Sequence, residues 1–201
     1  GAHGYDVFSN NGRAYVFYNG SIITENASGA DVFFTGAASA DGIGYSLAAI
    51  DINFDGETDL VAGGNGKVFI YYNDGTYGAA DVTITSSGGI NFGGSMTEGD
   101  LNADGRVDLV VGADSYSSLT GRAYIFYNDG SIPTTEATAD VMITGQGTSN
   151  YFATTLVTGD FNLDGKIDLA TAGKGYLTDK GRMYIYTMND SATAGESSSA
   201  F

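Results

Sequence analysis

The chain has 201 residues with 24 acidic and eight basic side chains, a formal net charge of −16, and no cysteine. Disulfides and thiol chemistry are therefore excluded, and nucleic-acid binding is disfavoured because it rests on basic residues that neutralise phosphates. No apolar run of about eighteen residues occurs, so we expect no membrane-spanning helix.

Glycine and aromatic residues indicate the fold class. The chain holds 31 glycines, 14 tyrosines and 11 phenylalanines but a single proline. Aromatic runs interrupted by glycine are typical of short β-strands joined by tight turns, and no helical periodicity competes with them. We therefore predict an all-β protein.

Residues 1–36 contain two expected strands. The first lies in the sequence Gly-Arg-Ala-Tyr-Val-Phe-Tyr-Asn at 12–19, and the second lies in Ala-Asp-Val-Phe-Phe-Thr-Gly at 30–36. Both patterns recur further along the chain, where two more strands precede them. Residues 1–36 are therefore predicted to form an incomplete repeat.

Residues 37–85 and 86–145 each contain four expected strands in one order. A strand precedes an acidic loop and a second follows it, as at 92–99 and 107–112. The glycine–basic–aromatic stretch and the Ala-Asp-Val stretch come next, at 66–73 and 80–85 in one unit and at 121–128 and 139–145 in the other. Residues 146–190 supply only the first three strands. Residues 191–201 are rich in Ser, Ala and Gly and are predicted to be a linker-like tail.

The repeat period indicates a β-propeller. The acidic loops begin at residues 51, 100 and 160, and a unit of about 50 residues with four strands is typical of a propeller blade. Two whole and two partial blades are too few for a closed ring, which needs about four to eight. We therefore expect a partial propeller whose further blades come from a longer chain or from an oligomer.

The acidic loops share the pattern D-x-N-x-D-G-x-x-D-L. Oxygen side chains at positions 1, 3 and 5, glycine at 6 and a carbonyl at 7 are typical of a calcium loop. Position 7 is Glu57, Arg106 or Lys166, so a backbone carbonyl fits all three copies. The loop is not an EF-hand, because its closing carboxylate stands at position 9 and position 12 carries no ligand. The alternative is a hairpin turn with solvated carboxylates, but three copies of a self-repelling loop favour a metal.

The Phe-Gly-Gly-Ser sequence at 92–95, the loop that follows it and Val-Val-Gly-Ala at 110–113 resemble the FG-GAP repeat. That repeat builds the seven-bladed head of integrin α subunits and of related microbial and fungal proteins. The resemblance covers the chain to about residue 189. It implies that each loop joins the first two strands of a blade and binds one calcium ion. The implied ligands are Asp51, Asn53, Asp55, Glu57 and Asp59; Asp100, Asn102, Asp104, Arg106 and Asp108; and Asp160, Asn162, Asp164, Lys166 and Asp168.

A structural role is expected for these three calcium ions, because a cation turns repulsion within each loop into a cross-link. Extracellular calcium modules bind at about 10⁻⁴ to 10⁻³ M, which suggests a secreted or cell-surface protein. We expect a non-enzymatic module for adhesion or protein interaction.

Two alternatives remain open. One is a carbohydrate-binding propeller, in which tyrosines stack on a sugar instead of filling blade interfaces. The other is the propeller part of a larger secreted hydrolase or lyase. The chain itself has one histidine, His3, and neither a G-x-S-x-G nor an H-E-x-x-H motif. The recurring basic residues Arg13, Lys67, Arg122 and Arg182 are expected to pack or to form salt bridges within blades.

Overall fold

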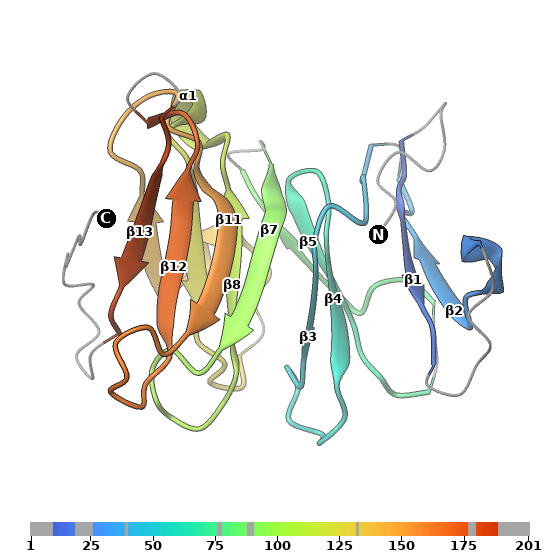
Figure 1. Cartoon of the computed structure of the whole chain (residues 1–201). Helices are drawn as coiled ribbons and strands as arrows, with labels where there is room; N and C mark the ends of the chain where they lie inside the picture. Colours follow the sequence, from blue (N-terminus) through green and yellow to red (C-terminus); the bar gives the residue numbers. More distant parts are fainter. Residues whose placement is uncertain are drawn as a thin grey trace.

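A computed structural model of the chain describes residues 10–18, 26–38, 40–75, 78–87, 91–131, 133–176 and 180–188. They form four antiparallel sheets that stand side by side in chain order (Figure 1). His3, the start of the first partial blade and the tail predicted at 191–201 lie outside the described residues.

Each of the two inner sheets is a meander of four strands. The second sheet contains β3 (Leu47–Ile50), β4 (Asp59–Gly63), β5 (Lys67–Tyr71) and β6 (Val82–Thr85). The third sheet contains β7 (Phe92–Gly99), β8 (Asp108–Ala113), β9 (Arg122–Phe126) and β10 (Val141–Thr144). These sheets confirm the predicted all-β fold with units of four antiparallel strands.

The two outer sheets contain fewer strands among the described residues. The first pairs β1 (Arg13–Val16) with β2 (Val32–Thr35), and the fourth contains β11 (Phe152–Gly159), β12 (Asp168–Gly173) and β13 (Arg182–Tyr186). They correspond to the last two and the first three strands of an inner sheet, which agrees with a partial propeller. Short turns of helix, η1 (Ala27–Gly29), α1 (Tyr116–Leu119) and η2 (Glu136–Thr138), lie in the connections. None of the described helices could cross a membrane.

The central strands of each inner sheet pack on both faces. In the second sheet, Val61 and Val68 belong to the core shared with the third sheet, and Ala62 and Phe69 belong to the core shared with the first. All four side chains are buried. Because successive side chains of a strand point to opposite faces, a strand between two sheets needs apolar residues at nearly every position.

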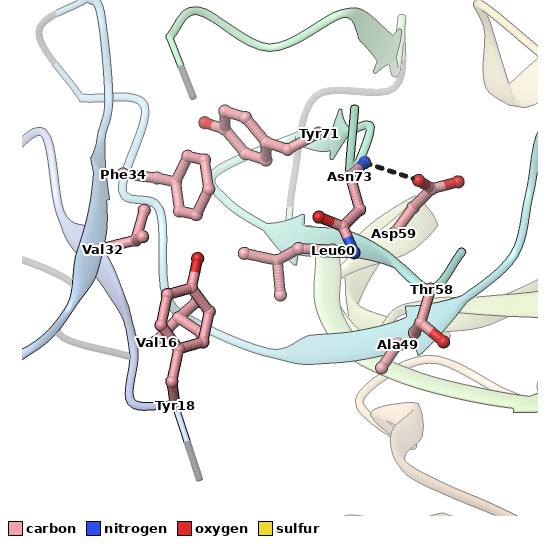
Figure 2. A pocket seen from close by; sticks show the side chains of 10 residues that line it. All are labelled: Val16, Tyr18, Val32, Phe34, Ala49, Thr58, Asp59, Leu60, Tyr71 and Asn73. Atoms are coloured by element: carbon pink, nitrogen blue, oxygen red, sulfur yellow. Dashed lines mark hydrogen bonds between the residues drawn. The ribbon is translucent and has the colours of Figure 1, made fainter. Parts of the chain in front are cut away.

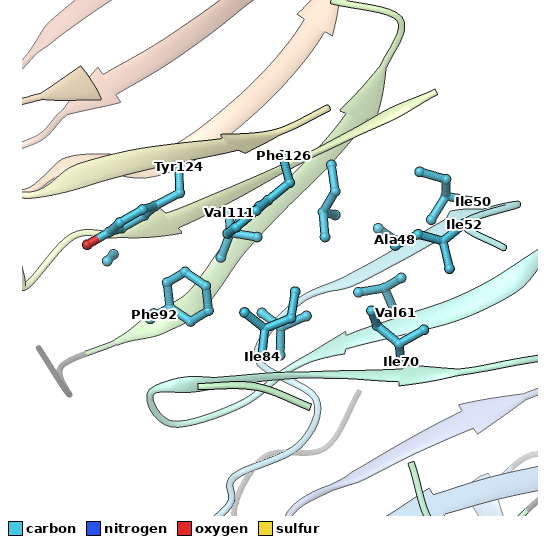
Figure 3. Packing of buried hydrophobic residues seen from close by; sticks show 13 residues of the cluster. Ala48, Ile50, Ile52, Val61, Ile70, Ile84, Phe92, Val111, Tyr124 and Phe126 are labelled. Atoms are coloured by element: carbon cyan, nitrogen blue, oxygen red, sulfur yellow. The ribbon is translucent and has the colours of Figure 1, made fainter. Parts of the chain in front are cut away.

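The Phe-Gly pair at the start of β7 lies in the interface between the second and third sheets. Phe92 is fully buried and packs edge to face on Tyr124, with ring centroids 5.3 Å apart (Figure 3). Gly93 follows with a φ of 89°, a backbone conformation that glycine adopts without a steric cost. Phe152 occupies the same place in the fourth sheet, but Ala153 there adopts a positive φ of 63° without being glycine.

Candidate metal-binding loops

The three acidic loops connect the first two strands of three sheets. Loop 1 (51–59) joins β3 to β4, loop 2 (100–108) joins β7 to β8, and loop 3 (160–168) joins β11 to β12. At position 4, Phe54, Ala103 and Leu163 have φ values of 63°, 59° and 64°, and the glycine at position 6 has a φ between 86° and 89°. The three loops therefore repeat one backbone turn.

The side chains at positions 1, 3 and 5 hold this turn together. In loop 1, Asp51 Oδ2 accepts a hydrogen bond from the Gly56 N–H (3.0 Å), and Asn53 Oδ1 accepts one from the Asp55 N–H (3.0 Å). Asp55 Oδ1 accepts from the Glu57 N–H at 2.8 Å. The same three bonds recur in loops 2 and 3 at 2.9 to 3.0 Å. Three oxygen-bearing side chains are thereby gathered around one short backbone segment.

The aspartate at position 9 is directed toward the strands. Asp108 is fully buried; its Oδ2 accepts from the Leu101 N–H (2.8 Å) and its Oδ1 from the Asn128 N–H (2.9 Å). Asp59 and Asp168 make the equivalent pairs of bonds in loops 1 and 3. Position 9 therefore ties each loop to its own start and to the end of the third strand of the same sheet.

In loops 1 and 2, the surroundings of the aspartate at position 9 disfavour its negative charge. Burial raises the pKa of Asp108, two backbone hydrogen bonds oppose the shift, and the Asp104 and Asp100 carboxylates raise the pKa further. The pKa of Asp59 is raised in the same way, first by burial and then by the neighbouring carboxylates of its loop. A nearby cation relieves repulsion of this kind.

The donor atoms of the loops suit a hard cation, because the side chains at positions 1, 3, 5 and 9 offer oxygen. Asp51 Oδ1 is buried and accepts no hydrogen bond. Across the part of the chain that the structure describes, however, no three His, Cys, Asp or Glu side chains converge closely enough to hold a metal. The loops thus have the oxygen donors of a calcium ligand set, and the carboxylate at position 9 of each accepts two backbone N–H bonds.

The side chain at position 7 of loop 2 does not point into its own loop. The Arg106 guanidinium lies over the ring of Phe54 in loop 1, 4.4 Å from the ring centroid, and donates to the Asn128 carbonyl oxygen (3.4 Å). Only the backbone carbonyl of Arg106 has the chemistry of a calcium ligand.

The sequence alone predicts no role for the residue that ends each glycine–basic–aromatic stretch. The structure shows that this residue donates its backbone N–H to position 9 of the loop: Asn73 to Asp59, and Asn128 to Asp108. Met188 does the same for Asp168 at 3.3 Å. The only signal in the sequence is the recurrence of the stretch, because a backbone donor places little restriction on the residue type.

The recurring basic residues pack within the sheets, as predicted. Lys67 Nζ lies 2.7 Å from the carboxylate of buried Asp41. Arg122 lies over the ring of Tyr116 at 3.9 Å, and Arg182 lies over Tyr176 at 3.6 Å. These cation–π contacts occupy the guanidinium faces, so a ligand-binding role is not needed to explain the repeat.

A cavity of about 200 Å³ lies between the first and second sheets (Figure 2). Phe34 and Tyr71 form one part of its wall, and Leu60 forms another; Asn73 and Asp59 lie at its edge. Burial raises the pKa of Tyr71 to about 12, with contributions from Asp41 and Asp81. A smaller cavity of about 10 Å³ lies between the second and third sheets, and its lining includes Ile50, Ile52 and Leu109.

Comparison with protein families identifies the repeat. A family model described as the FG-GAP-like repeat matches residues 51–111 and again residues 100–171, more than half of the chain. The chain belongs to the FG-GAP repeat family. Each match begins at the first aspartate of an acidic loop, so the FG-GAP unit here starts with the loop and ends in the next sheet. No curated protein matches the chain. Membership supports a propeller-like interaction module.

Proposed function

We propose that this FG-GAP chain is part of a calcium-stabilised propeller that acts outside the cell as a non-enzymatic module for adhesion or protein interaction. The observation that carries the proposal is the threefold repetition of one acidic loop geometry, with a buried aspartate at position 9 of each loop.

Calcium would act on two parts of each loop that are held by different backbone groups. Positions 1, 3 and 5 surround the loop backbone, and position 9 is bound to the strands. The cation would be held by the carboxylates at positions 1, 5 and 9, the amide oxygen at 3 and the carbonyl at 7. In each loop, the chain's own residues fix the two strands that the loop joins. The bound ion would supply the positive charge that offsets repulsion between the carboxylates of the loop.

The extracellular assignment follows from this ligand set. Loops of this kind in extracellular modules bind calcium at about 10⁻⁴ to 10⁻³ M, a concentration found outside cells and not in the cytosol. A protein or a glycan at a cell surface is the ligand that we propose. Further blades, from a longer chain or from an oligomer, would cover the outer faces of the first and fourth sheets and complete the division into blades at 1–36, 37–85, 86–145 and 146–190.

A carbohydrate ligand is favoured by one further observation. A second cavity, of about 210 Å³, combines the polar groups of Ser131, Thr138 and Asp140 with the ring of Tyr127. Sugars bind where hydrogen-bonding groups lie beside aromatic surface. A catalytic role has no support among the described residues, so any hydrolase or lyase activity would belong to another part of a longer protein.

Isothermal titration of the chain with calcium tests the proposal. We expect three calcium ions per chain, and the variants Asp55→Ala, Asp104→Ala and Asp164→Ala should each remove one. Magnesium should compete poorly, because it prefers a smaller, octahedral and partly hydrated site. Absence of binding heat at millimolar calcium would reject the proposal. Binding to a glycan array would then separate the carbohydrate alternative from a protein ligand.

A further inference from the structure

Loops 1 and 2 touch each other, although they belong to different sheets. The side chain of Asn128, in the third sheet, donates a hydrogen bond of 3.1 Å from Nδ2 to the backbone carbonyl oxygen of Asp51, the first residue of loop 1. The backbone N–H of the same residue donates to Asp108 Oδ1, the last carboxylate of loop 2. One buried residue, 6% exposed, therefore holds the start of one loop and the end of the other.

A second contact joins the same two loops. Arg106 at position 7 of loop 2 covers the ring of Phe54 at position 4 of loop 1, and it also donates to the Asn128 carbonyl oxygen. The positive guanidinium is attracted to the negative face of the ring. Asn128, Arg106 and Phe54 thus form a continuous link between the loops.

We infer that loops 1 and 2 bind calcium cooperatively, with Asn128 as the positioning residue that couples them; this inference rests on the calcium role proposed above. Calcium in loop 2 would bind Asp108 together with the side chains at positions 1, 3 and 5. Asp108 is tied to Asn128, and Asn128 fixes the carbonyl of Asp51. Ordering of loop 2 therefore orders the start of loop 1, and the second loop binds with less loss of conformational freedom.

Loop 3 lacks both contacts to loop 2. The residue that corresponds to Asn128 is Met188, whose side chain has no hydrogen-bond donor. The residue that corresponds to Phe54 is Ala103, which offers no ring to Lys166. The fourth sheet instead meets the strand before loop 2, where Thr158 Oγ1 donates a hydrogen bond to the Glu98 carbonyl oxygen and Ile167 lies beside Gly99. The coupling is therefore specific to loops 1 and 2, and loop 3 is a control within the same chain.

Site-resolved titration by NMR can separate the three loops. The N–H groups of Gly56, Gly105 and Gly165 each donate to the first aspartate of their own loop, at 3.0, 2.9 and 2.9 Å. Their chemical shifts therefore report calcium binding loop by loop in the intact chain.

We expect Asp104→Ala, which disables loop 2, to raise the calcium concentration at half-saturation of Gly56 by about fivefold or more. Asp164→Ala, which disables loop 3, should leave the Gly56 titration unchanged. Coupling is reciprocal, so Asp55→Ala should weaken the Gly105 titration by the same factor.

Asn128→Met introduces into the third sheet the residue type that the fourth sheet has at the equivalent position, Met188. We expect the calcium titration of Gly56 to become independent of loop 2 in this variant. Phe54→Ala makes the equivalent change to loop 1 at an exposed position and should reduce the dependence without affecting folding. The inference would be overturned if Asp104→Ala left the calcium titration of Gly56 unchanged, or if the coupling persisted in both Asn128→Met and Phe54→Ala. Either result would leave the calcium proposal intact. No response of any of the three glycines to calcium would overturn both.

Discussion

Ser46 Oγ donates a hydrogen bond of 2.7 Å to the carbonyl oxygen of Gly93, which lies 47 residues later and in the next sheet. The equivalent hydrogen bond between neighbouring sheets recurs one repeat further on, where Ser95 Oγ donates to the carbonyl oxygen of Ala153 at 2.7 Å. Both acceptors have a positive φ. The FG-GAP motif therefore encodes the contact between consecutive blades as well as the blade itself.

Ser46→Ala should remove this hydrogen bond between the second and third sheets. We expect a loss of about 1 kcal/mol in the free energy of unfolding, because the carbonyl of Gly93 loses its partner. Urea denaturation measures the change. Ser131→Ala is the control, since Ser131 Oγ bonds to Asp129 within its own exposed turn. Equal effects of the two substitutions would show that the Ser46 bond does not stabilise the interface.

Gly63→Ala tests how closely two sheets approach each other. A Cβ atom on Gly63 would lie 2.0 Å from the Gly93 carbonyl oxygen and 2.4 Å from Ser46 Oγ. Relief of this clash requires the backbone to shift, so we expect about 1–3 kcal/mol of destabilisation in thermal or urea unfolding. Gly147→Ala is the control, because no atom lies within 4 Å of its added Cβ. Unchanged stability of Gly63→Ala would mean that the interface is looser than the structure shows.

Lys67→Met should leave the buried carboxylate of Asp41 without its cation. Removing one partner of a fully buried pair costs about 3–5 kcal/mol. Lys67 is 37% exposed, so we expect a smaller loss of about 1–3 kcal/mol from solvent screening. Lys67→Arg should retain most of the stability, and Asp41→Asn should partly rescue Lys67→Met. A Lys67→Met variant as stable as the parent chain would contradict this assignment.

Tyr71→Phe should protect the fold at alkaline pH. Burial raises the pKa of Tyr71 to about 12, above its ordinary value of 10.0. The folded state therefore favours the neutral phenol, and the resulting stability is fully present below pH 10 and is lost as the pH rises toward 12. Phenylalanine occupies the equivalent position, Phe126, in the third sheet, so the substitution suits the fold. Unfolding free energies measured at pH 9 and pH 11.5 should fall less for Tyr71→Phe. A parallel decline in both proteins would contradict the role of this phenol.

Repetition made the fold predictable from the sequence. The strand predicted at 92–99 is observed as β7, and the strand predicted at 107–112 is observed as β8 within one residue. Three near-identical copies also located the acidic loops, because one loop geometry requires the same short-range pattern each time. Local patterns of this kind are visible in a sequence since the interacting residues lie within about ten positions.

Contacts between sheets could not be predicted in the same way. The hydrogen bond from Asn128 to Asp51 spans 77 residues and depends on how two sheets are positioned. Ala153 has a positive φ like the equivalent Gly93, a conformation that its residue type does not predict. The orientation of Asp108 toward the strands likewise follows from its burial, which a pattern of charges does not reveal. The calcium ligands themselves stay a prediction.

A thermal melt in millimolar calcium, compared with the same melt in EGTA and in magnesium, tests the central claim most directly. Three loops at about 100 times the dissociation constant would each add about 2.7 kcal/mol, provided that the unfolded chain does not bind. The account predicts a large, calcium-specific rise in the melting temperature that the triple variant Asp55→Ala/Asp104→Ala/Asp164→Ala abolishes. Identical melting temperatures in calcium and EGTA would contradict it and would identify the acidic loops as ordinary turns.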